Sequence, residues 1–353
     1  MELVEPFQTA SLEQMLFESL DVEGKGQLTR TQLLEPFRQA GIPLDDPRLV
    51  SMLDKMDAYG QAFTLTEFQD VIQGCTVLVQ KVLQGNLVIP DYAALCETIR
   101  DIYTTTQANW GGAVADYIPQ LKRVDPEKYG VSLCTIDGQR FSVGDAKDYF
   151  CIQSSTKPIN YCIALEDNGA ELTHQHVGRE PSGRGFNELT LNDDGLPHNP
   201  MINAGAIMTC ALIQRELSIA DRFDYIMDTW SRAAGYQKIG FNNAVYLSER
   251  QTADRNFALG YFMKEKDAFP PGTNLIEILE FYFQCCSIEV TTEIMSVVAG
   301  TLANGGLCPI TGERIFHAET VKNTLSLMSS CGMYDFSGEF AFSVGLPAKS
   351  GVS

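Results

Sequence analysis

The chain of 353 residues lacks several features by which broad classes of protein are recognised. Basic side chains are few, 26 against 45 acidic ones, and the formal charge of -19 would repel a nucleic-acid backbone or an anionic membrane surface. No apolar run approaches the roughly 18 residues needed to span a bilayer, and residues 1–10 lack the basic start and apolar stretch of a secretory signal. We therefore expect no nucleic-acid partner, no membrane insertion and no export signal.

Cysteine and histidine are present without the spacing of redox, triad or metal motifs. None of the ten cysteines belongs to a Cys-x-x-Cys pair, so free thiols in a reducing compartment fit better than a disulfide scaffold. None of the four histidines accompanies a Gly-x-Ser-x-Gly nucleophile elbow. His174 and His176 could face one side of a strand, but loop histidines are far commoner than ligands, and we expect no metal site.

Residues 1–72 are predicted to form a small helical domain that resembles paired EF-hands. Two segments with apolar residues at helical spacing flank a loop that begins at Asp21. Lys25 puts a cation where calcium needs an oxygen ligand, and Gln32 stands where a bidentate glutamate is required. We expect EF-hand packing without the metal, followed by a connection over residues 73–90.

Residues 91–353 are predicted to form an α/β domain in which strands at the two ends of the segment enclose a helical insert. Two strand patterns separated by Asp137-Gly138 indicate a hairpin near the start of this domain. Further along the chain, the patterns predict helices over 275–284 and 291–303 and strands over 340–344 and 349–353.

A serine and a lysine lie one helical turn apart directly after the hairpin, in Gln153-Ser-Ser-Thr-Lys-Pro. Proline is tolerated near the start of a helix, so Pro158 predicts that a helix begins at about Ser154 or Ser155. Residues three apart share a helix face at roughly 5–6 Å between Cβ atoms, which lets the Lys157 amine reach the Ser154 hydroxyl. A lysine in a dry site can lose its proton near neutral pH and activate a serine nucleophile.

A second element, Lys349-Ser350-Gly351, follows in the predicted last strand. Penicillin-recognising hydrolases combine a Ser-x-x-Lys helix with a Lys-Thr/Ser-Gly strand, whose backbone N–H completes the oxyanion hole. The two elements in this order favour a serine hydrolase with a β-lactamase or DD-peptidase type of fold. The Ser-Asp-Asn element of that class is absent, which argues against β-lactam chemistry.

Several longer segments extend this pattern over most of the chain, from about Ile89 to the last residue. They are Gln153-Ser-Ser-Thr-Lys-Pro, His176-Val-Gly-Arg-Glu-Pro-Ser-Gly, His198-Asn-Pro-Met-Ile-Asn-Ala-Gly-Ala-Ile, Ser248-Glu-Arg, Asp254-Arg-Asn, Phe281-Tyr-Phe-Gln, Cys331-Gly-Met-Tyr-Asp-Phe-Ser-Gly and Ala348-Lys-Ser-Gly-Val. Together they resemble the serine-dependent glutaminases, and the preceding helical domain resembles that of the animal kidney- and liver-type enzymes. The resemblance implies hydrolysis of L-glutamine to L-glutamate and ammonia without a cofactor.

The resemblance also implies a role for each matching residue. Ser154 would attack the side-chain amide with Lys157 as its base, and Tyr334 and Tyr282 would relay a proton to the leaving ammonia. The remaining positions implied to bind substrate are Tyr117, Gln153, Asn203, Glu249 and Asn256, with the backbone N–H groups of Ser154 and Val352 as the oxyanion hole. Taken singly, a tyrosine such as Tyr117 is more often a core residue, and Asn203 is as plausible as a helix cap.

Regulation and assembly are likewise implied by the resemblance alone. The loop made of Arg184, Gly185, Phe186, Asn187 and Glu188 matches a family segment whose ordering accompanies activation by inorganic phosphate and assembly into dimers, tetramers or filaments. A mitochondrial location is implied, with a cytoplasmic one as the alternative. The family's catalytic domain continues past the Lys-Ser-Gly-Val segment, so we expect that this domain is C-terminally truncated at Ser353.

Two other functions stay open at this point. A penicillin-binding-type serine acyl transferase would share Ser154, Lys157 and Lys349, but it would not need Glu249. A non-catalytic EF-hand-like assembly module would depend on the first 72 residues and would show no turnover.

Overall fold

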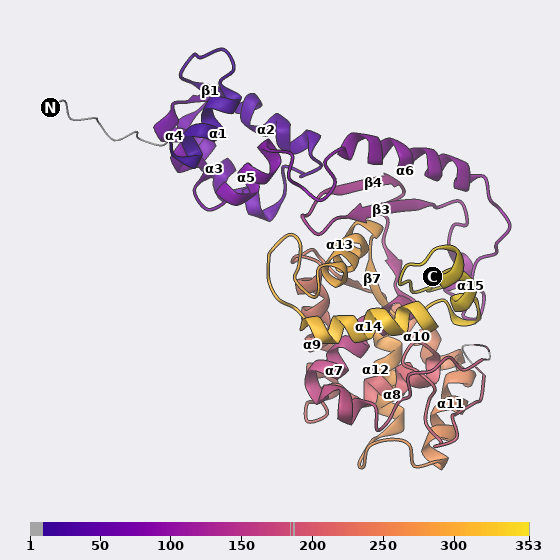
Figure 1. Cartoon of the computed structure of the whole chain (residues 1–353). Coiled ribbons are helices and arrows are strands. Elements are labelled where there is room, and N and C mark those ends of the chain that lie inside the picture. The colour runs from indigo at the N-terminus through magenta and orange to yellow at the C-terminus, as the bar shows by residue number, and fades with distance from the viewer. Residues whose placement is uncertain (1–9, 184, 186–187, 353) are drawn as a thin grey trace. The chain divides into compact units, whose positions relative to one another are not determined.

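The computed structural model describes residues 10–183, 185 and 188–352, which fall into two compact units (Figure 1). The first unit comprises Met1–Thr106, Leu133–Val143 and Pro309–Thr311, and the second comprises Gln107–Ser132, Gly144–Cys308 and Gly312–Ser353. Residues 73–106 and most of the hairpin thus group with the helical domain, whereas the sequence suggested a connection over 73–90 and a second domain from residue 91. No helix of the described residues is both long and apolar enough to cross a membrane.

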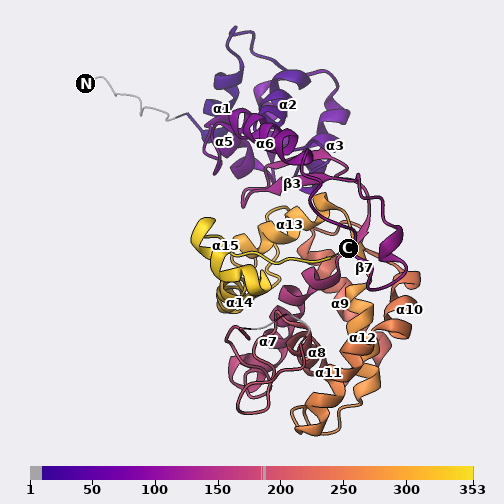
Figure 2. The same ribbon diagram turned by 90° about the vertical axis from the view of Figure 1, so that its right-hand side faces the viewer.

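The first unit is a bundle of short helices with two small two-stranded sheets (Figure 2). Its elements are α1 Leu12–Leu20, β1 Leu28–Thr29, α2 Arg30–Gln39, η1 Pro47–Leu49, α3 Val50–Tyr59, β2 Ala62–Phe63, α4 Leu65–Ile72, α5 Thr76–Leu83, α6 Tyr92–Gln107, β3 Gly130–Cys134 and β4 Arg140–Gly144. The helical repeats and the hairpin expected from the sequence are present at these positions.

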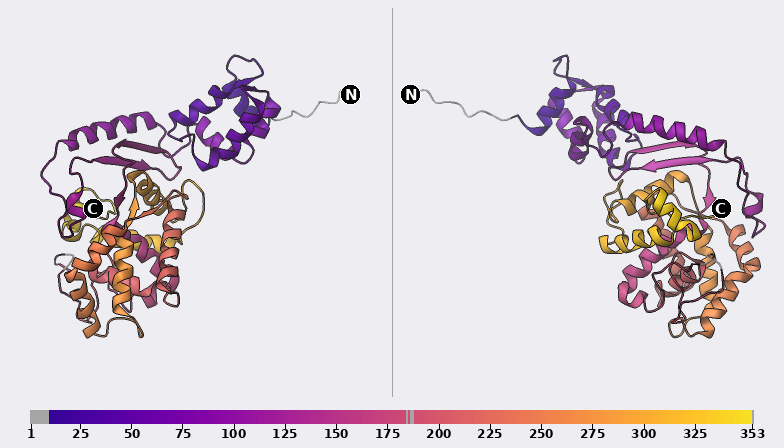
Figure 3. Two further views of the ribbon diagram at one scale, coloured as in Figure 1. Left: turned by 180° about the vertical axis from the view of Figure 1, so that it is seen from behind. Right: turned by 45° about the vertical axis from the view of Figure 1, so that its right-hand side comes forward.

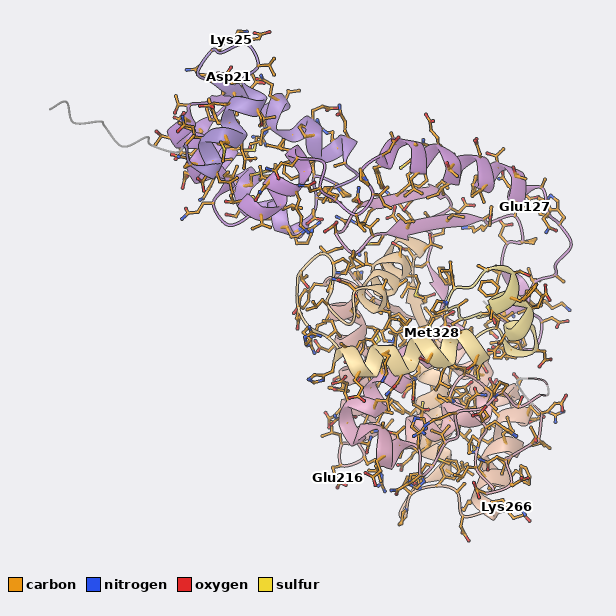
Figure 4. All side chains as sticks on the ribbon, in the orientation of Figure 1. Asp21, Lys25, Glu127, Glu216, Lys266 and Met328 are labelled. Atoms are coloured by element: carbon orange, nitrogen blue, oxygen red, sulfur yellow. The ribbon has the colours of Figure 1, made fainter. Side chains whose placement is uncertain are left out.

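The two helix–loop–helix repeats pack against each other through a short antiparallel sheet. Leu28 of β1 lies opposite Phe63 of β2, and both side chains are fully buried. In the first loop, Asp21 accepts hydrogen bonds from the backbone N–H groups of Lys25 and Gly26, at 2.9 and 2.7 Å. The Lys25 ammonium forms an ion pair with Glu23 in the same loop, and Figure 4 labels Asp21 and Lys25. Asp21, at the first ligand position of the loop, thus bonds the backbone of the loop itself.

The hairpin is fastened to the helical bundle by buried polar groups. Gln139 is fully buried, and its amide nitrogen donates to the carbonyls of Ala40 and Ile89 at 2.9 and 3.0 Å. Asp46, also fully buried, accepts from Arg48 and from Arg140 of β4. These contacts explain why the hairpin groups with the helices.

The second unit is mainly helical (Figure 3). It contains one three-stranded antiparallel sheet, in the order β5-β7-β6. Its elements are η2 Leu121–Arg123, β5 Phe150–Cys151, η3 Gln153–Thr156, α7 Lys157–Thr173, α8 Asn203–Leu212, α9 Ile219–Ala233, β6 Gly240–Phe241, α10 Asn243–Thr252, α11 Asp254–Glu265, α12 Leu275–Cys286, β7 Ile288–Val290, α13 Thr292–Ala303, α14 Ala318–Cys331, η4 Tyr334–Phe336 and α15 Ser337–Ser343.

Helix α8 lies at the centre of this unit. All its residues from Ala204 to Leu212 are buried, so it is apolar around its whole circumference, as expected of a helix inside a core. Gly205 permits the close approach of the preceding loop, since a Cβ atom there would lie 1.8 Å from the carbonyl oxygen of Asn199. Helices α7 and α12 pack against α8 and contribute to the same hydrophobic cluster.

The prediction of two strands near the end of the chain, over 340–344 and 349–353, is wrong. Residues 337–343 form helix α15, although Phe340, Phe342 and Val344 alternate as they would in a strand. A strand needs a neighbour to bond its backbone, and a short helix satisfies those groups internally. Residues 349–352 have no regular structure; Ser350 N–H donates to the carbonyl of Gly332 at 3.2 Å.

The buried Asp46 provides a test of the contact between hairpin and bundle. The Asp46→Asn substitution leaves the guanidinium groups of Arg48 and Arg140 without their counter-ion. We expect it to lower the free energy of unfolding by about 3 kcal/mol. The exposed pair of Arg30 and Asp57 is the control, because Asp57→Asn should cost less than about 1 kcal/mol. Urea unfolding would measure both values, and equal losses would contradict this account.

Candidate active site

Ser154 and Lys157 meet at the junction where β5 passes through η3 into α7. The Lys157 ammonium donates a hydrogen bond to the Ser154 hydroxyl, and the lysine side chain is 1% exposed. Pro158 occupies the first turn of α7, where its missing N–H costs no hydrogen bond. The predicted helix start and the predicted serine–lysine contact are both present in the structure.

The turn that presents Ser154 has a constrained backbone. Gln153 has a φ of 45°, in the left-handed region that a side chain other than glycine rarely adopts. The turn is tied to the sheet because Ile152 N–H donates to the carbonyl of Ile288 at 2.9 Å. On the other side, the chain around Gly351 runs against the turn, since a Cβ atom there would lie 2.6 Å from the Ser155 hydroxyl. The sheet and the end segment thus fix the direction of the serine.

Ser154 opens into a cavity of about 250 Å³. The cavity is smaller than the roughly 300–1,000 Å³ of drug-sized pockets, so it suits a small metabolite. Its lining includes every position that the resemblance implied for substrate binding: Tyr117, Gln153, Ser154, Asn203, Glu249, Asn256, Tyr282, Tyr334 and Val352. The structure brings these residues together; their individual roles stay predictions.

A buried carboxylate forms one wall of the cavity. Glu249 is 2% exposed and lies on α10, and its Oε1 accepts a hydrogen bond from the Tyr117 hydroxyl at 2.7 Å. Burial raises the pKa of Glu249, while hydrogen bonds from Tyr117 and Gln153 and the charge of Lys157 oppose the rise. A carboxylate kept in a dry cavity attracts a cationic group of a ligand strongly.

Neutral amide side chains form another part of the cavity wall. Asn203, at the start of α8, donates from its Nδ2 to the Oδ1 of Asn256 at 3.0 Å, which fixes both side chains. Within the described part of the chain, the Asn203 Oδ1 is buried without a hydrogen-bond partner. Buried polar atoms are normally paired, so this oxygen is available to a ligand in the cavity.

Two tyrosines and a second lysine surround the reacting pair. Tyr282 is 3% exposed, and its ring centroid lies 5.9 Å from the Lys157 nitrogen; burial raises its pKa well above the usual value. Tyr334 has a φ of 54°, and the Lys349 nitrogen lies 3.9 Å from its ring centroid. Burial, together with the charge of Lys157, lowers the pKa of Lys349 to about 6. Lys349 is therefore largely neutral at neutral pH when Lys157 carries a proton.

The sequence did not single out all of the lining. Thr252, Ala253, Asp254, Arg255 and Cys286 also face the cavity. Arg255 stands inside the Asp254-Arg-Asn segment that carried the resemblance, and Cys286 comes one helical turn after Tyr282. Membership of this segment could have indicated Arg255, and the helical spacing from Tyr282 could have indicated Cys286.

The predicted activation loop is described only in part. Arg184, Phe186 and Asn187 lie outside the described residues. Glu188 N–H donates to the carbonyl of Gly185 at 3.2 Å, and neither of these two residues lines the cavity. Within residues 10–183, 185 and 188–352, no group of three or more His, Cys, Asp and Glu side chains is placed to hold a metal ion.

The raised pKa of Glu249 gives a prediction about stability. A carboxyl group with a raised pKa binds its proton more tightly in the folded state than in the unfolded state. Its ionisation therefore lowers stability as pH rises from the unfolded-state pKa through the raised folded-state pKa. We expect Glu249→Gln to raise the urea midpoint at pH 7, with a gain that shrinks as pH falls toward about 4.5 and is absent below that value, where both states bind the proton. The exposed Glu265 on α11 is the control, and Glu265→Gln should show no gain at either pH. A loss of stability at pH 7 in Glu249→Gln would contradict the assignment.

Comparison with known proteins places the chain in a family. Residues 112–353 match the family model described as glutaminase, and residues 12–90 match one described as an EF-hand domain. The chain is 47% identical to putative glutaminase 2 of Caenorhabditis elegans over 97% of its length, covering 59% of that protein. It is 46% identical to the mitochondrial liver isoform of glutaminase from Mus musculus over 94% of its length, covering 56% of that protein. The chain thus spans less than two thirds of the length of both relatives.

Solved structures agree with this placement. A probable glutaminase, ybaS, superposes with a TM-score of 0.69 at 33% identity, covering 73% of this chain and 83% of that one. The structure of Mglu in its native form superposes with a TM-score of 0.67 at 37% identity, and the match covers 71% of this chain and 60% of the Mglu chain. The predicted α/β class with an EF-hand-like helical domain in front is confirmed. The residues around Ser154 therefore lie on a fold that this chain shares with its relatives, and the chain belongs to the glutaminase family.

Proposed function

We propose that this chain hydrolyses L-glutamine to L-glutamate and ammonia through a glutamyl ester on Ser154. The observation that carries the proposal is the contact between the Lys157 amine and the Ser154 hydroxyl at the wall of a small cavity. The glutaminase names of the relatives in the worm and the mouse support the same reaction.

The lining of the cavity suits the whole amino acid. The α-ammonium of glutamine would pair with the buried Glu249 carboxylate. The Asn203 Oδ1, which lacks a hydrogen-bond partner in the described chain, would accept a hydrogen bond from the substrate, and the Gln153 amide beside Glu249 would offer a further polar contact. Asn256 holds Asn203 in place through its own amide. Such a set of groups recognises a zwitterion better than a simple amide.

The reaction would proceed in two balanced steps. The neutral Lys157 amine takes the Ser154 proton, and the hydroxyl oxygen attacks the side-chain amide carbon of glutamine. The backbone N–H groups of Ser154 and Val352 stabilise the oxyanion, and ammonia leaves with a proton relayed through Tyr334 or Tyr282. Water then attacks the ester, giving glutamate and restoring the serine.

Assembly, regulation and location belong to the same proposal and rest on the resemblance. We propose self-association to dimers, tetramers or filaments, activation by inorganic phosphate, and no resident cofactor. A mitochondrial location is supported by the name of the liver isoform of the mouse.

The direct test measures ammonia release from L-glutamine by the purified chain, with and without inorganic phosphate. We expect turnover with glutamine that Ser154→Ala lowers by at least about 1,000-fold, because the nucleophile is lost. L-Asparagine is the matched substrate, one methylene shorter. A covalent β-lactam adduct on Ser154 without glutamine turnover would favour the acyl transferase, and full activity of Ser154→Ala would contradict the serine mechanism.

A further inference from the structure

The first unit contains a second hollow, formed where the end of α2, the start of α6 and strand β4 meet. This groove has a volume of about 490 Å³. Side chains that line it include Arg38, Tyr92, Glu97, Arg100, Arg140 and Phe141. Three guanidinium groups against one carboxylate are unexpected in a chain with 45 acidic and 26 basic residues.

The floor of the groove is held by backbone contacts. Arg140 N–H donates to the carbonyl of Gly41 at 2.8 Å, which fastens β4 to the end of α2. Gly41 lies directly on the Tyr92 ring, because a Cβ atom there would come within 2.2 Å of it. The arginines of the groove therefore stand on elements that are fixed to each other before any ligand binds.

The ion pairs below the groove do not neutralise all of its positive charge. The Asp46 carboxylate faces two guanidinium groups, binding Arg48 through both oxygens at 2.9 Å and Arg140 through one at 3.0 Å. One carboxylate cannot neutralise two arginines. The Arg140 Nε is buried without a hydrogen-bond partner in the described residues, so a charged donor at this wall is unsatisfied.

Arg100 adds a second cation on the facing helix. Its guanidinium carbon lies 4.9 Å from the centroid of the Phe141 ring, a stacking arrangement that restricts the side chain. Arg38, at the rim, has its carboxylate partner Glu35 at 3.4 Å on the exposed side. Arg140 shares its carboxylate with Arg48, and Glu97 is the one carboxylate of the lining, so positive charge remains in the groove around Arg100 and Arg140.

We infer that this groove binds a small multivalent anion, one bearing phosphate or carboxylate groups, between Arg100 and Arg140. Planar guanidinium groups match the oxygens of both kinds of anion, and the fixed floor reduces the entropy lost on binding. Tyr92 and Phe141 supply an apolar wall for the rest of such a molecule. The inference concerns the first unit and does not depend on the proposed reaction of the second.

Calorimetric titration of the whole chain with sodium pyrophosphate, and separately with sodium citrate, tests the inference at constant ionic strength. We expect one site per chain with a Kd below about 1 mM for at least one of the two, and their comparison separates phosphate from carboxylate ligands. Arg100→Gln should weaken binding by about 10-fold. Arg140→Lys keeps a charge beside Asp46 but loses the planar fork, and it should weaken binding as well.

The matched control is Arg123→Gln, which removes an exposed arginine that does not line the groove and should leave the affinity unchanged. Circular dichroism verifies that each variant is folded. An affinity that Arg100→Gln and Arg140→Lys leave unchanged would overturn the inference by placing the anion elsewhere. Absence of binding of both anions up to about 10 mM would overturn it too, because such affinity is too weak for a built site.

Discussion

The proposed chemistry depends on one contact, the hydrogen bond between the Lys157 amine and the Ser154 hydroxyl. One turn of helix places the two groups on the same face, and burial of Lys157 keeps water from competing for its amine. The contact needs the turn at Gln153, the sheet behind it and the end segment beside it. The rest of the second unit can be understood as support for this geometry.

The cavity concentrates groups that weaken a folded protein. Glu249 is buried with a raised pKa, Lys349 is buried with a lowered pKa, and the Oδ1 atom of Asn203 lacks a hydrogen-bond partner in the described chain. Each of these costs stability in the free protein, and each becomes favourable once a ligand supplies the missing charge or hydrogen bond. Active sites commonly show this exchange of stability for function. The apolar core around α8 provides the stability that offsets it.

Sequence reasoning succeeded where the signal is local. Ser154 and Lys157 lie within one turn, and Asp137-Gly138 forms its hairpin from adjacent residues, so spacing alone predicted both. Glu249 and Asn203 reach the same cavity from different helices, and only the resemblance to a family indicated that they belong together. No periodicity could have done so, because their proximity depends on how α8, α10 and α12 pack.

The errors have a similar physical origin. The alternating apolar residues near Phe342 suggested a strand, but the pattern could not reveal that the segment has no neighbouring strand and forms α15 instead. The polar contacts that fasten the hairpin to the bundle, through Gln139 and Asp46, join positions about 50 to 100 residues apart and left no pattern in the sequence. The groove with Arg100 and Arg140 arises from the same distant contacts.

The measurement that tests the central claim most directly is acid quenching of the chain during turnover with L-glutamine, followed by mass spectrometry of the peptide that contains Ser154. The account predicts that this peptide gains the mass of one glutamyl group, and that the gain is lost in Ser154→Ala. Release of ammonia without any acylated serine, in a quench fast enough to capture the ester, would contradict it and point to direct attack by water.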